Sequence, residues 1–230
     1  MKGDINDAIV ELWNTYFAND EEVYAPLFYK DLKRGGLLFV GMNPSFSIQG
    51  FSRSLKGSKY EGMDPKDFYL WKSVRQDLSR VSACADIERM SHTTYTSYFG
   101  VLRDIAKEVG LDWEHVDLFL YRETNQASFE SRIFSKGKLN DFAKDQLSLF
   151  RRIVGSINPK VIVINNARGS KIVQEYLKDG LVYDSELGCH LLKVGDSRVP
   201  IFFTSMLSGQ RSLDVHSRER LVWHIKKVLD

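Results

Sequence analysis

Short runs made up mainly of apolar residues alternate along the chain with segments in which apolar residues recur every three or four positions. The runs are typical of strands buried in a sheet, and they lie at residues 37–40, 116–121, 161–164, 191–194 and 199–203. The helical spacing occurs near residues 5–16, 68–78, 98–109, 142–157, 169–177 and 221–229. This alternation predicts an α/β fold with three layers, α/β/α, around a central mainly parallel sheet of about four strands.

The composition is that of an ordinary globular protein. The chain has 230 residues, of which 43% are hydrophobic and 27% charged, and no linker-like stretch divides it, so we expect a single domain over residues 1–230. Its 32 basic and 30 acidic residues give a formal charge of +2, which is too balanced for binding nucleic acid by bulk charge. Any contact with DNA must therefore be local.

Several functional classes lack their sequence signatures. Cys84, Cys189 and the five histidines show no metal-ligand spacing, and no glycine-rich dinucleotide or nucleoside-triphosphate loop is present. The first residues lack the pattern of a signal peptide, and no apolar stretch reaches about 18 residues. We expect a cytoplasmic monomer with no metal, no cofactor and no membrane contact.

Candidate chemistry lies where the predicted strands end, because parallel sheets bind ligands outside the carboxyl ends of their strands. The first strand runs into Gly-Met-Asn-Pro-Ser at residues 41–45. Gly41 allows a close approach of backbone and ligand, Pro44 stiffens the turn, and Asn43 offers an amide. An amide can hold a water through its carbonyl oxygen, although it is not a strong base. A role for Asn43 as a turn cap is the alternative.

The exit of the last strand, residues 204–211, combines hydroxyl groups with a cation before a helix. Ser205, Ser208 and Arg211 suit phosphate oxygens. Met206 and Leu207 are apolar, and proteins that extrude a base often push an apolar wedge into the stack. Burial of both under the terminal helix is equally compatible with the sequence.

Other strand ends and one loop supply further candidates. Asn125 offers a donor and an acceptor that could read a base edge, and Asn165 could close the crevice. The polar segment 46–66 is interpreted as a long loop, in which Arg53, Lys56 and Lys59 are candidate phosphate contacts. A solvated charged loop is the alternative for these three.

Residues 41–45 and 203–211 together resemble two motifs of the uracil-DNA glycosylase superfamily, in particular its mismatch-specific and single-strand-selective branches. The first family motif follows a buried strand as Gly-x-Asn-Pro-Gly or similar, and the element order over most of the chain, including residues 158–166, is also similar. The resemblance implies that Asn43 positions the attacking water and that Phe51, or Phe46 in its place, stacks on the flipped base. It also implies a base pocket that includes four neighbours of Asn43, namely Gly41, Met42, Pro44 and Ser45.

The second family motif is often His-Pro-Ser followed by a leucine. Residues 203–211 keep Ser205, the apolar position and Arg211, but they lack the histidine that would stabilise a departing uracil anion. The resemblance implies a DNA-repair hydrolase that excises uracil or a related deaminated base, with Asn43 and Ser205 as catalytic residues and DNA as partner. A catalytically inactive nucleic-acid-binding module of the same fold, or a hydrolase of small N-glycosides, are the alternatives.

Overall fold

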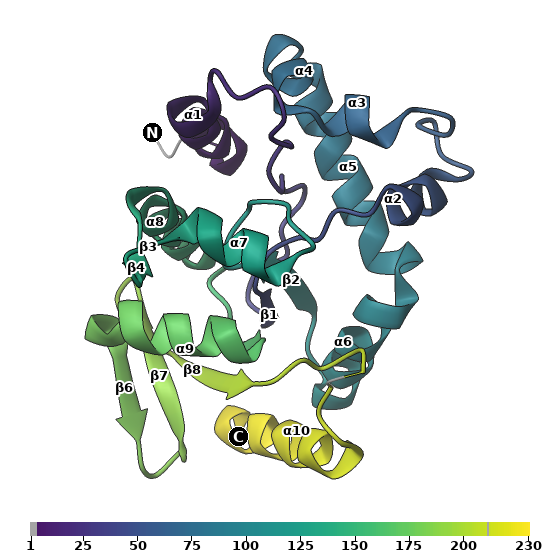
Figure 1. The fold of residues 1–230 in the computed structure, drawn as a ribbon. Helices are drawn as coiled ribbons and strands as arrows, with labels where there is room; N and C mark the ends of the chain where they lie inside the picture. The colour runs from purple at the N-terminus through teal and green to yellow at the C-terminus, as the bar shows by residue number, and fades with distance from the viewer. Residues whose placement is uncertain (1–3, 211) are drawn as a thin grey trace. The chain divides into compact units, whose positions relative to one another are not determined.

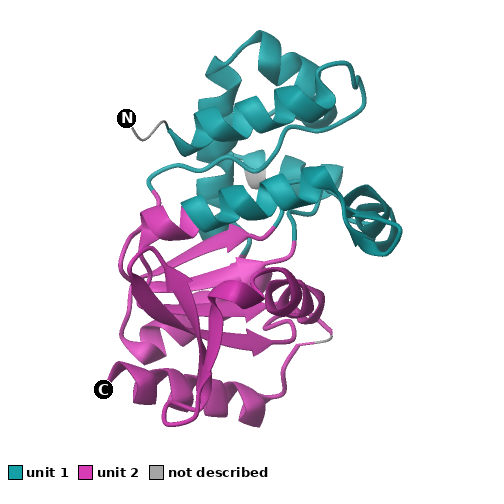
Figure 2. Cartoon of the chain, turned by 90° about the vertical axis from the view of Figure 1, so that its left-hand side faces the viewer, with its two compact units in different colours: residues 1–31, 43–95, 119–152 teal, residues 32–42, 96–118, 153–230 magenta. Residues whose placement is uncertain are grey.

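The computed structural model describes residues 4–210 and 212–230, which divide into two compact units (Figure 2). Unit 1 consists of residues 1–31, 43–95 and 119–152. Unit 2 consists of residues 32–42, 96–118 and 153–230. Each unit is thus assembled from three segments that are distant in the sequence, and the single domain expected over residues 1–230 stays a prediction.

Unit 2 contains the sheet of six strands. The strands lie in the order β2, β1, β5, β8, β7, β6, of which the first four are mutually parallel and the last two run antiparallel to their neighbours. Their bounds are β1 Leu37–Gly41, β2 Trp113–Asp117, β5 Val161–Asn165, β6 Leu181–Asp184, β7 Cys189–Val194 and β8 Ser197–Thr204. The α/β class is confirmed, whereas the prediction of about four mainly parallel strands was wrong because the sheet is mixed and larger.

Two tight turns account for the antiparallel part of the sheet. Gly195, with φ 61°, lies in the turn between β7 and β8, and Gly188, with φ 65°, lies in the turn between β6 and β7. Such short connections can only join antiparallel neighbours. Strand β6 has no buried apolar run, since Val182 and Tyr183 are exposed, and it therefore gave no signal of a buried strand.

Strand β2 begins and ends earlier than the apolar run at 116–121 predicts. Its residues include buried Glu114, His115 and Asp117, so its sequence is not apolar throughout. Leu118 still donates its N–H to Gly41 O of β1 at 3.0 Å, but Leu120 bonds outside the sheet: it donates its N–H to Gln146 Oε1 at 2.7 Å and accepts from the N–H of Leu27 at 3.1 Å. A run of apolar residues thus marks burial here and not the strand itself.

Helices lie on both faces of the sheet within unit 2 (Figure 1). These are α6 Thr96–Val109, α9 Ala167–Tyr176, the short 3-10 helix η1 Lys178–Gly180 and α10 Val215–Leu229. On one face, α6 and α10 share a core with strand residues such as Phe39 and Val163. On the other face α9 approaches Ile164 at Gly169. The carboxyl ends of β1, β2 and β5 therefore meet beside α6.

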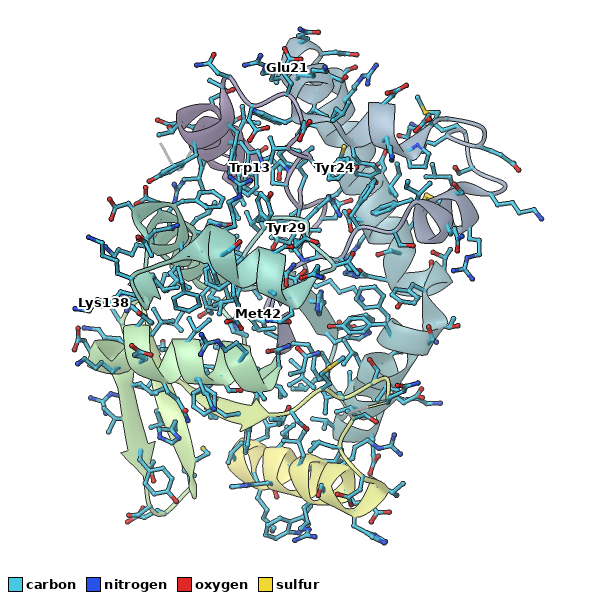
Figure 3. The ribbon with its side chains drawn as sticks, viewed as in Figure 1. Trp13, Glu21, Tyr24, Tyr29, Met42 and Lys138 are labelled. Carbon is cyan, nitrogen blue, oxygen red and sulfur yellow. The ribbon has the colours of Figure 1, made fainter. Side chains whose placement is uncertain are left out.

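Unit 1 is mainly helical. Its helices are α1 Ile5–Phe17, α2 Ile48–Leu55, α3 Pro65–Tyr69, α4 Trp71–Gln76, α5 Ser79–Thr94, α7 Gln126–Ile133 and the larger part of α8 Asp141–Ile157, with a hairpin of β3 Phe134–Ser135 and β4 Lys138–Leu139. Buried aromatic rings form part of its interior, with Phe142 edge-on to Phe17 at 4.9 Å. The indole of Trp13 donates to the main-chain oxygen of Tyr24 at 3.1 Å, and both residues are marked in Figure 3.

The interpretation of residues 46–66 as a loop was wrong in part. Helix α2 occupies residues 48–55, and Ser47 caps it by accepting a hydrogen bond from Gly50 N at 3.2 Å. Ile48, Phe51 and Leu55 fall on one face of these two turns.

Among the described residues, no helix has the length and apolar character that crossing a bilayer requires.

Candidate functional site

Asn43 follows the exit of β1 and is held by three main-chain oxygens of unit 1. Its Nδ2 donates to the oxygen of Glu123 at 2.7 Å and to those of Tyr121 and Pro44 at 3.3 Å each. Carbonyl oxygens only accept, so the amide nitrogen must face them and Oδ1 must point away. Within the described residues, Oδ1 has no hydrogen-bond partner. The three hydrogen bonds stabilise the turn, which fits the alternative role of Asn43 as a turn cap. They also leave Oδ1 as an acceptor in a fixed position.

The segment 121–125 faces this turn. Pro44 accepts from Glu123 N at 3.1 Å, and the hydroxyl of Thr124 accepts from Phe46 N at 3.0 Å and donates to Phe46 O at 2.7 Å. Asn125 caps α7 through Oδ1, which accepts from Ser128 N at 3.0 Å. The oxygen of Asn125 is therefore already used by the helix, and its role in reading a base stays a prediction.

The two candidate stacking residues belong to one aromatic cluster of unit 1. Phe46 stacks on Tyr24 with ring centroids 4.1 Å apart and 25° between the planes, and it lies 5.1 Å from Phe51. Phe51 in turn lies 4.6 Å from Tyr69. Both phenylalanines are half-buried. The structure thus brings Asn43, Phe46 and Phe51 into the same unit, while a stacked base remains a prediction.

A buried cation supports this cluster. The guanidinium of Arg122 lies 5.4 Å from the ring of Phe51 and 4.8 Å from that of Tyr69. Arg122 pairs with Glu88 and donates to Ala25 O at 3.0 Å. A buried charge needs such a partner, since removing one member of the pair leaves the other without compensation. The Arg122–Glu88 pair therefore fixes the platform under Phe51.

A cavity of about 600 Å³ lies beside the Asn43 turn within unit 1. Glu123 lines it, and the main-chain oxygen of this residue accepts from Asn43. Tyr121 also lines it, with the Arg132 guanidinium 5.4 Å from its ring. Burial raises the pKa of the Tyr121 hydroxyl, which therefore stays protonated at neutral pH. The cavity thus combines an aromatic wall with a carboxylate and a guanidinium.

A second polar group lies at the strand ends of unit 2, and we call its residues, Gly41, Tyr98, His115, Asp117 and Asn165, the Asn165 cluster. The amide Nδ2 of Asn165 donates to the Tyr98 hydroxyl at 3.2 Å, which lies 3.2 Å from His115 Nε2. His115 Nε2 lies 4.0 Å from Asp117 Oδ1. His115, Asp117 and Asn165 are all buried, at 7%, 6% and 4% exposure.

Sequence reasoning singled out Gly41 and Asn165 but missed the other three residues of this cluster. The available signal was polar residues at alternate positions of a strand, at 115 and 117, since alternate residues point to one face of a sheet. Gly41 pairs with Asp117 across the parallel ladder. A Cβ at Gly41 would lie 2.1 Å from Asp117 Oδ1 and 3.1 Å from His115 Nε2. Glycine is therefore required by the cluster.

We expect Gly41→Ala to lower the free energy of unfolding by about 1–3 kcal/mol, because the added methyl group overlaps the buried Asp117 carboxylate and forces it to shift. Urea denaturation measures the change. Gly155→Ala is the matched control, since a Cβ at Gly155 meets no atom within 4 Å and its position in α8 favours alanine. Equal midpoints for the two variants would contradict the close contact between Gly41 and Asp117.

The residues after β8 that are assigned to DNA contact differ in how exposed they are. Met206 is 38% exposed, whereas Leu207 is 4% exposed and lies in the core formed with α6 and α10. Leu207 is therefore buried, which is the alternative to the wedge role, and it would have to leave the core to act as a wedge. Ser208 is buried, and Ser205 is half-buried. Met206 is the apolar side chain that this segment exposes.

Leu207→Ala should therefore act mainly on stability. We expect a loss of about 2–5 kcal/mol in the free energy of unfolding, as for other buried leucines, and a change below about 0.5 kcal/mol for Met206→Ala. Denaturation in urea distinguishes the two variants. A stable Leu207→Ala protein with weakened DNA binding would instead support the wedge role of Leu207.

The remaining candidates have different surroundings. Arg53 and Lys56 are exposed in or next to α2, and neither forms an ion pair with a described residue, whereas Lys59 Nζ lies 3.7 Å from Asp86. Ser45 is exposed, and Met42 is buried. Arg211 lies outside the described residues. Because Asn43 belongs to unit 1 and Ser205 to unit 2, their joint action stays a prediction.

Comparison with known proteins adds no family to this picture: no protein-family model matches the sequence, and no curated protein is significantly similar to it. In the part of the chain that the structure describes, no group of three or more His, Cys, Asp and Glu side chains could hold a metal ion. The fold defines an α/β protein with polar groups at the carboxyl ends of its parallel strands.

Proposed function

We propose that the protein is a DNA N-glycosylase that hydrolyses the N-glycosidic bond of a flipped uracil or related deaminated base. The observation that carries the proposal is the Asn43 amide, whose nitrogen is fixed by three carbonyl oxygens and whose Oδ1 is left as an acceptor. A water that donates to Oδ1 is held in a defined position after β1. Positioning of this kind lowers the barrier without requiring a strong base.

The reaction balances with water as the only co-reactant. The bond between the deoxyribose carbon and the base nitrogen breaks, and its electron pair leaves with the base. The water oxygen bonds to the sugar carbon, and the proton that it loses ends on the departing base. The products are a free base and an abasic site. Glu123 lines the cavity beside this turn, and its carboxylate, whose Oε1 accepts from Asn125 N at 2.7 Å, is the candidate to carry that proton.

Recognition of the substrate is assigned to the residues named from the sequence. Phe51 and Phe46 offer rings for stacking, and Asn165 offers an amide at the end of β5. Exposed Arg53 and Lys56 suit phosphates, and exposed Met206 replaces Leu207 as the wedge candidate. Under this proposal the whole chain is a three-layer uracil-DNA glycosylase-like domain that acts in base-excision repair.

One sequence observation favours a second candidate, a binding module of the same fold. Residues 203–211 lack the histidine that would stabilise the departing anion. Donors placed around a developing charge usually contribute strongly to catalysis, so their loss would slow base release. Binding through stacking and phosphate contacts would remain.

Incubation with lesion-bearing oligonucleotides, single-stranded and paired, tests the proposal. We expect abasic sites in oligonucleotides that contain uracil or a related deaminated base, detected as strand breaks after alkali. Binding to DNA without base release from any lesion would identify the binding module. Hydrolysis of free nucleosides without affinity for oligonucleotides would identify a hydrolase of small N-glycosides.

A further inference from the structure

The cavity of about 600 Å³ in unit 1 has a wall of aromatic rings, which belong to Tyr16, Phe17, Tyr121 and Phe142. The ring centroid of Phe142 lies 4.9 Å from that of Phe17, 5.0 Å from that of Tyr16 and 6.2 Å from that of Tyr121. The Tyr16 hydroxyl donates to Asp145 Oδ2 at 2.7 Å, and burial together with this carboxylate raises the pKa of Tyr16 to about 12. Burial also raises the pKa of Tyr121. Both tyrosines therefore stay uncharged at neutral pH, and the wall suits a ligand with an aromatic body.

The same rings hold the guanidinium of Arg132 in the cavity. It lies over the ring of Phe17 at 5.8 Å and over that of Tyr121 at 5.4 Å. A stacked guanidinium uses its face, so the N–H groups along its edge remain donors, and it has more of them than one hydrogen bond to the Tyr121 hydroxyl uses. Arg132 forms no ion pair with any residue that the structure describes. Its free edge suits a carboxylate, whose two oxygens can both accept from it.

A carboxylate of opposite charge lines the same cavity. Glu123 is half-buried, and its Oε1 accepts from Asn125 N at 2.7 Å, which leaves its second oxygen without a partner in the described part of the chain. Glu123 and Arg132 do not pair with each other, although both act electrostatically on the Tyr121 hydroxyl. The third charged residue of the lining, Asp141, pairs with Lys144 Nζ at 2.9 Å. The cavity therefore presents one cation and one anion, each ready for a partner.

We propose that this cavity binds a small zwitterion with an aromatic body, of the class of the free aromatic α-amino acids. The ligand carboxylate accepts from the edge of Arg132, the ligand ammonium group donates to Glu123, and the ligand ring packs against the aromatic wall. A ligand with charge of one sign satisfies only one of the two wall charges, and a charge that loses water without gaining a partner is costly. The inference goes beyond the proposed function, since this ligand is not a nucleic acid.

Calorimetry on the full chain with four matched probes tests the proposal. The first probe, L-phenylalanine, carries both charges and a ring. Of the others, 3-phenylpropionate lacks the ammonium group, phenethylamine lacks the carboxylate, and glycine lacks the ring. We expect the wild type to bind phenylalanine at least about tenfold more tightly than each of the other three, which is the scale of one hydrogen bond to a charged group.

Two variants should each remove a different preference. Arg132→Met removes the cation, so the preference for phenylalanine over phenethylamine should fall to one or below, while the preference over 3-phenylpropionate remains. Glu123→Gln should abolish the preference over 3-phenylpropionate and keep that over phenethylamine. A general loosening of unit 1 would instead lower both preferences in both variants. Arg151→Met is the matched control, since Arg151 is an exposed arginine of α8 in the same unit that does not line the cavity, and it should keep the wild-type ratios.

A wild type that does not bind phenylalanine at millimolar concentrations, or that binds the four probes equally, would overturn the proposal. A folded Arg132→Met protein that keeps its preference for phenylalanine over phenethylamine would do so too. These results are separate from the test of the proposed function, because no probe is a nucleic acid. Abasic sites without phenylalanine binding keep the glycosylase and remove this site, whereas the expected ratios without any abasic site keep this site and remove the catalysis.

Discussion

Asn43→Ala should reduce the rate of base release by at least about 10²-fold while DNA affinity stays nearly unchanged, because the variant loses the acceptor that positions the water. Single-turnover release from a uracil-containing oligonucleotide measures the rate, and a titration with the same oligonucleotide measures the affinity. Asn14→Ala is the matched control, since Asn14 is an exposed asparagine of α1 in the same unit and should behave as the wild type.

Asn43→Asp is a second test of the role of Asn43. A carboxylate has two acceptor oxygens, and one of them would face the main-chain oxygens of Glu123, Tyr121 and Pro44 that Nδ2 now binds. The repulsion should turn the side chain or keep it protonated. We therefore expect Asn43→Asp to be impaired as well, and an Asp variant more active than the wild type would show that a general base is needed at this position.

Glu88→Ala should lower the free energy of unfolding by about 3–5 kcal/mol, because it leaves the buried guanidinium of Arg122 without its counter-charge. The aromatic platform should loosen with it, since Phe51 and Tyr69 pack on that guanidinium. Urea denaturation followed by tryptophan fluorescence measures the loss.

Two further variants separate a buried pair from an ordinary surface pair. Glu21, which is marked in Figure 3, is exposed and pairs with Lys72. Glu21→Ala should lower the free energy of unfolding by less than about 1 kcal/mol. Glu88→Leu combined with Arg122→Met should recover most of the stability, because it replaces both charges by apolar side chains of similar volume. A Glu88→Ala protein as stable as Glu21→Ala would mean that water reaches Arg122.

The parallel part of the sheet could be predicted because its strands are buried on both faces. Residues 37–41 and 161–165 are fully buried, and their sequences are almost entirely apolar. Strand β7 was predicted at residues 191–194, but β6 was not apparent because it is half-exposed. The predicted bounds of β2 were displaced because its buried residues include charged ones. Periodicity reports burial, and it identifies a strand only where burial and strand coincide.

The candidate site was predictable as a set of residue types and not as a set of contacts. The turn at residues 41–45 indicated an amide at a strand end, but the oxygens that fix Asn43 come from residues 121 and 123, far along the chain. The alternate positions of His115 and Asp117 indicated one face of a strand, but their closeness to Gly41 arises from the pairing of β1 with β2, which the sequence pattern does not specify. Leu207 was assigned to a wedge, yet the packing of α6 and α10 around it places it in the core.

The measurement that tests the central claim most directly compares abasic-site formation by the wild type and Asn43→Ala on the same uracil-containing oligonucleotide. The account predicts alkali-labile breaks at the uracil position with the wild type and at least about 10²-fold fewer per unit time with the variant. Equal numbers of breaks with both proteins would contradict the role of Asn43. No breaks with the wild type, on this or any other deaminated base, would contradict the proposed glycosylase activity.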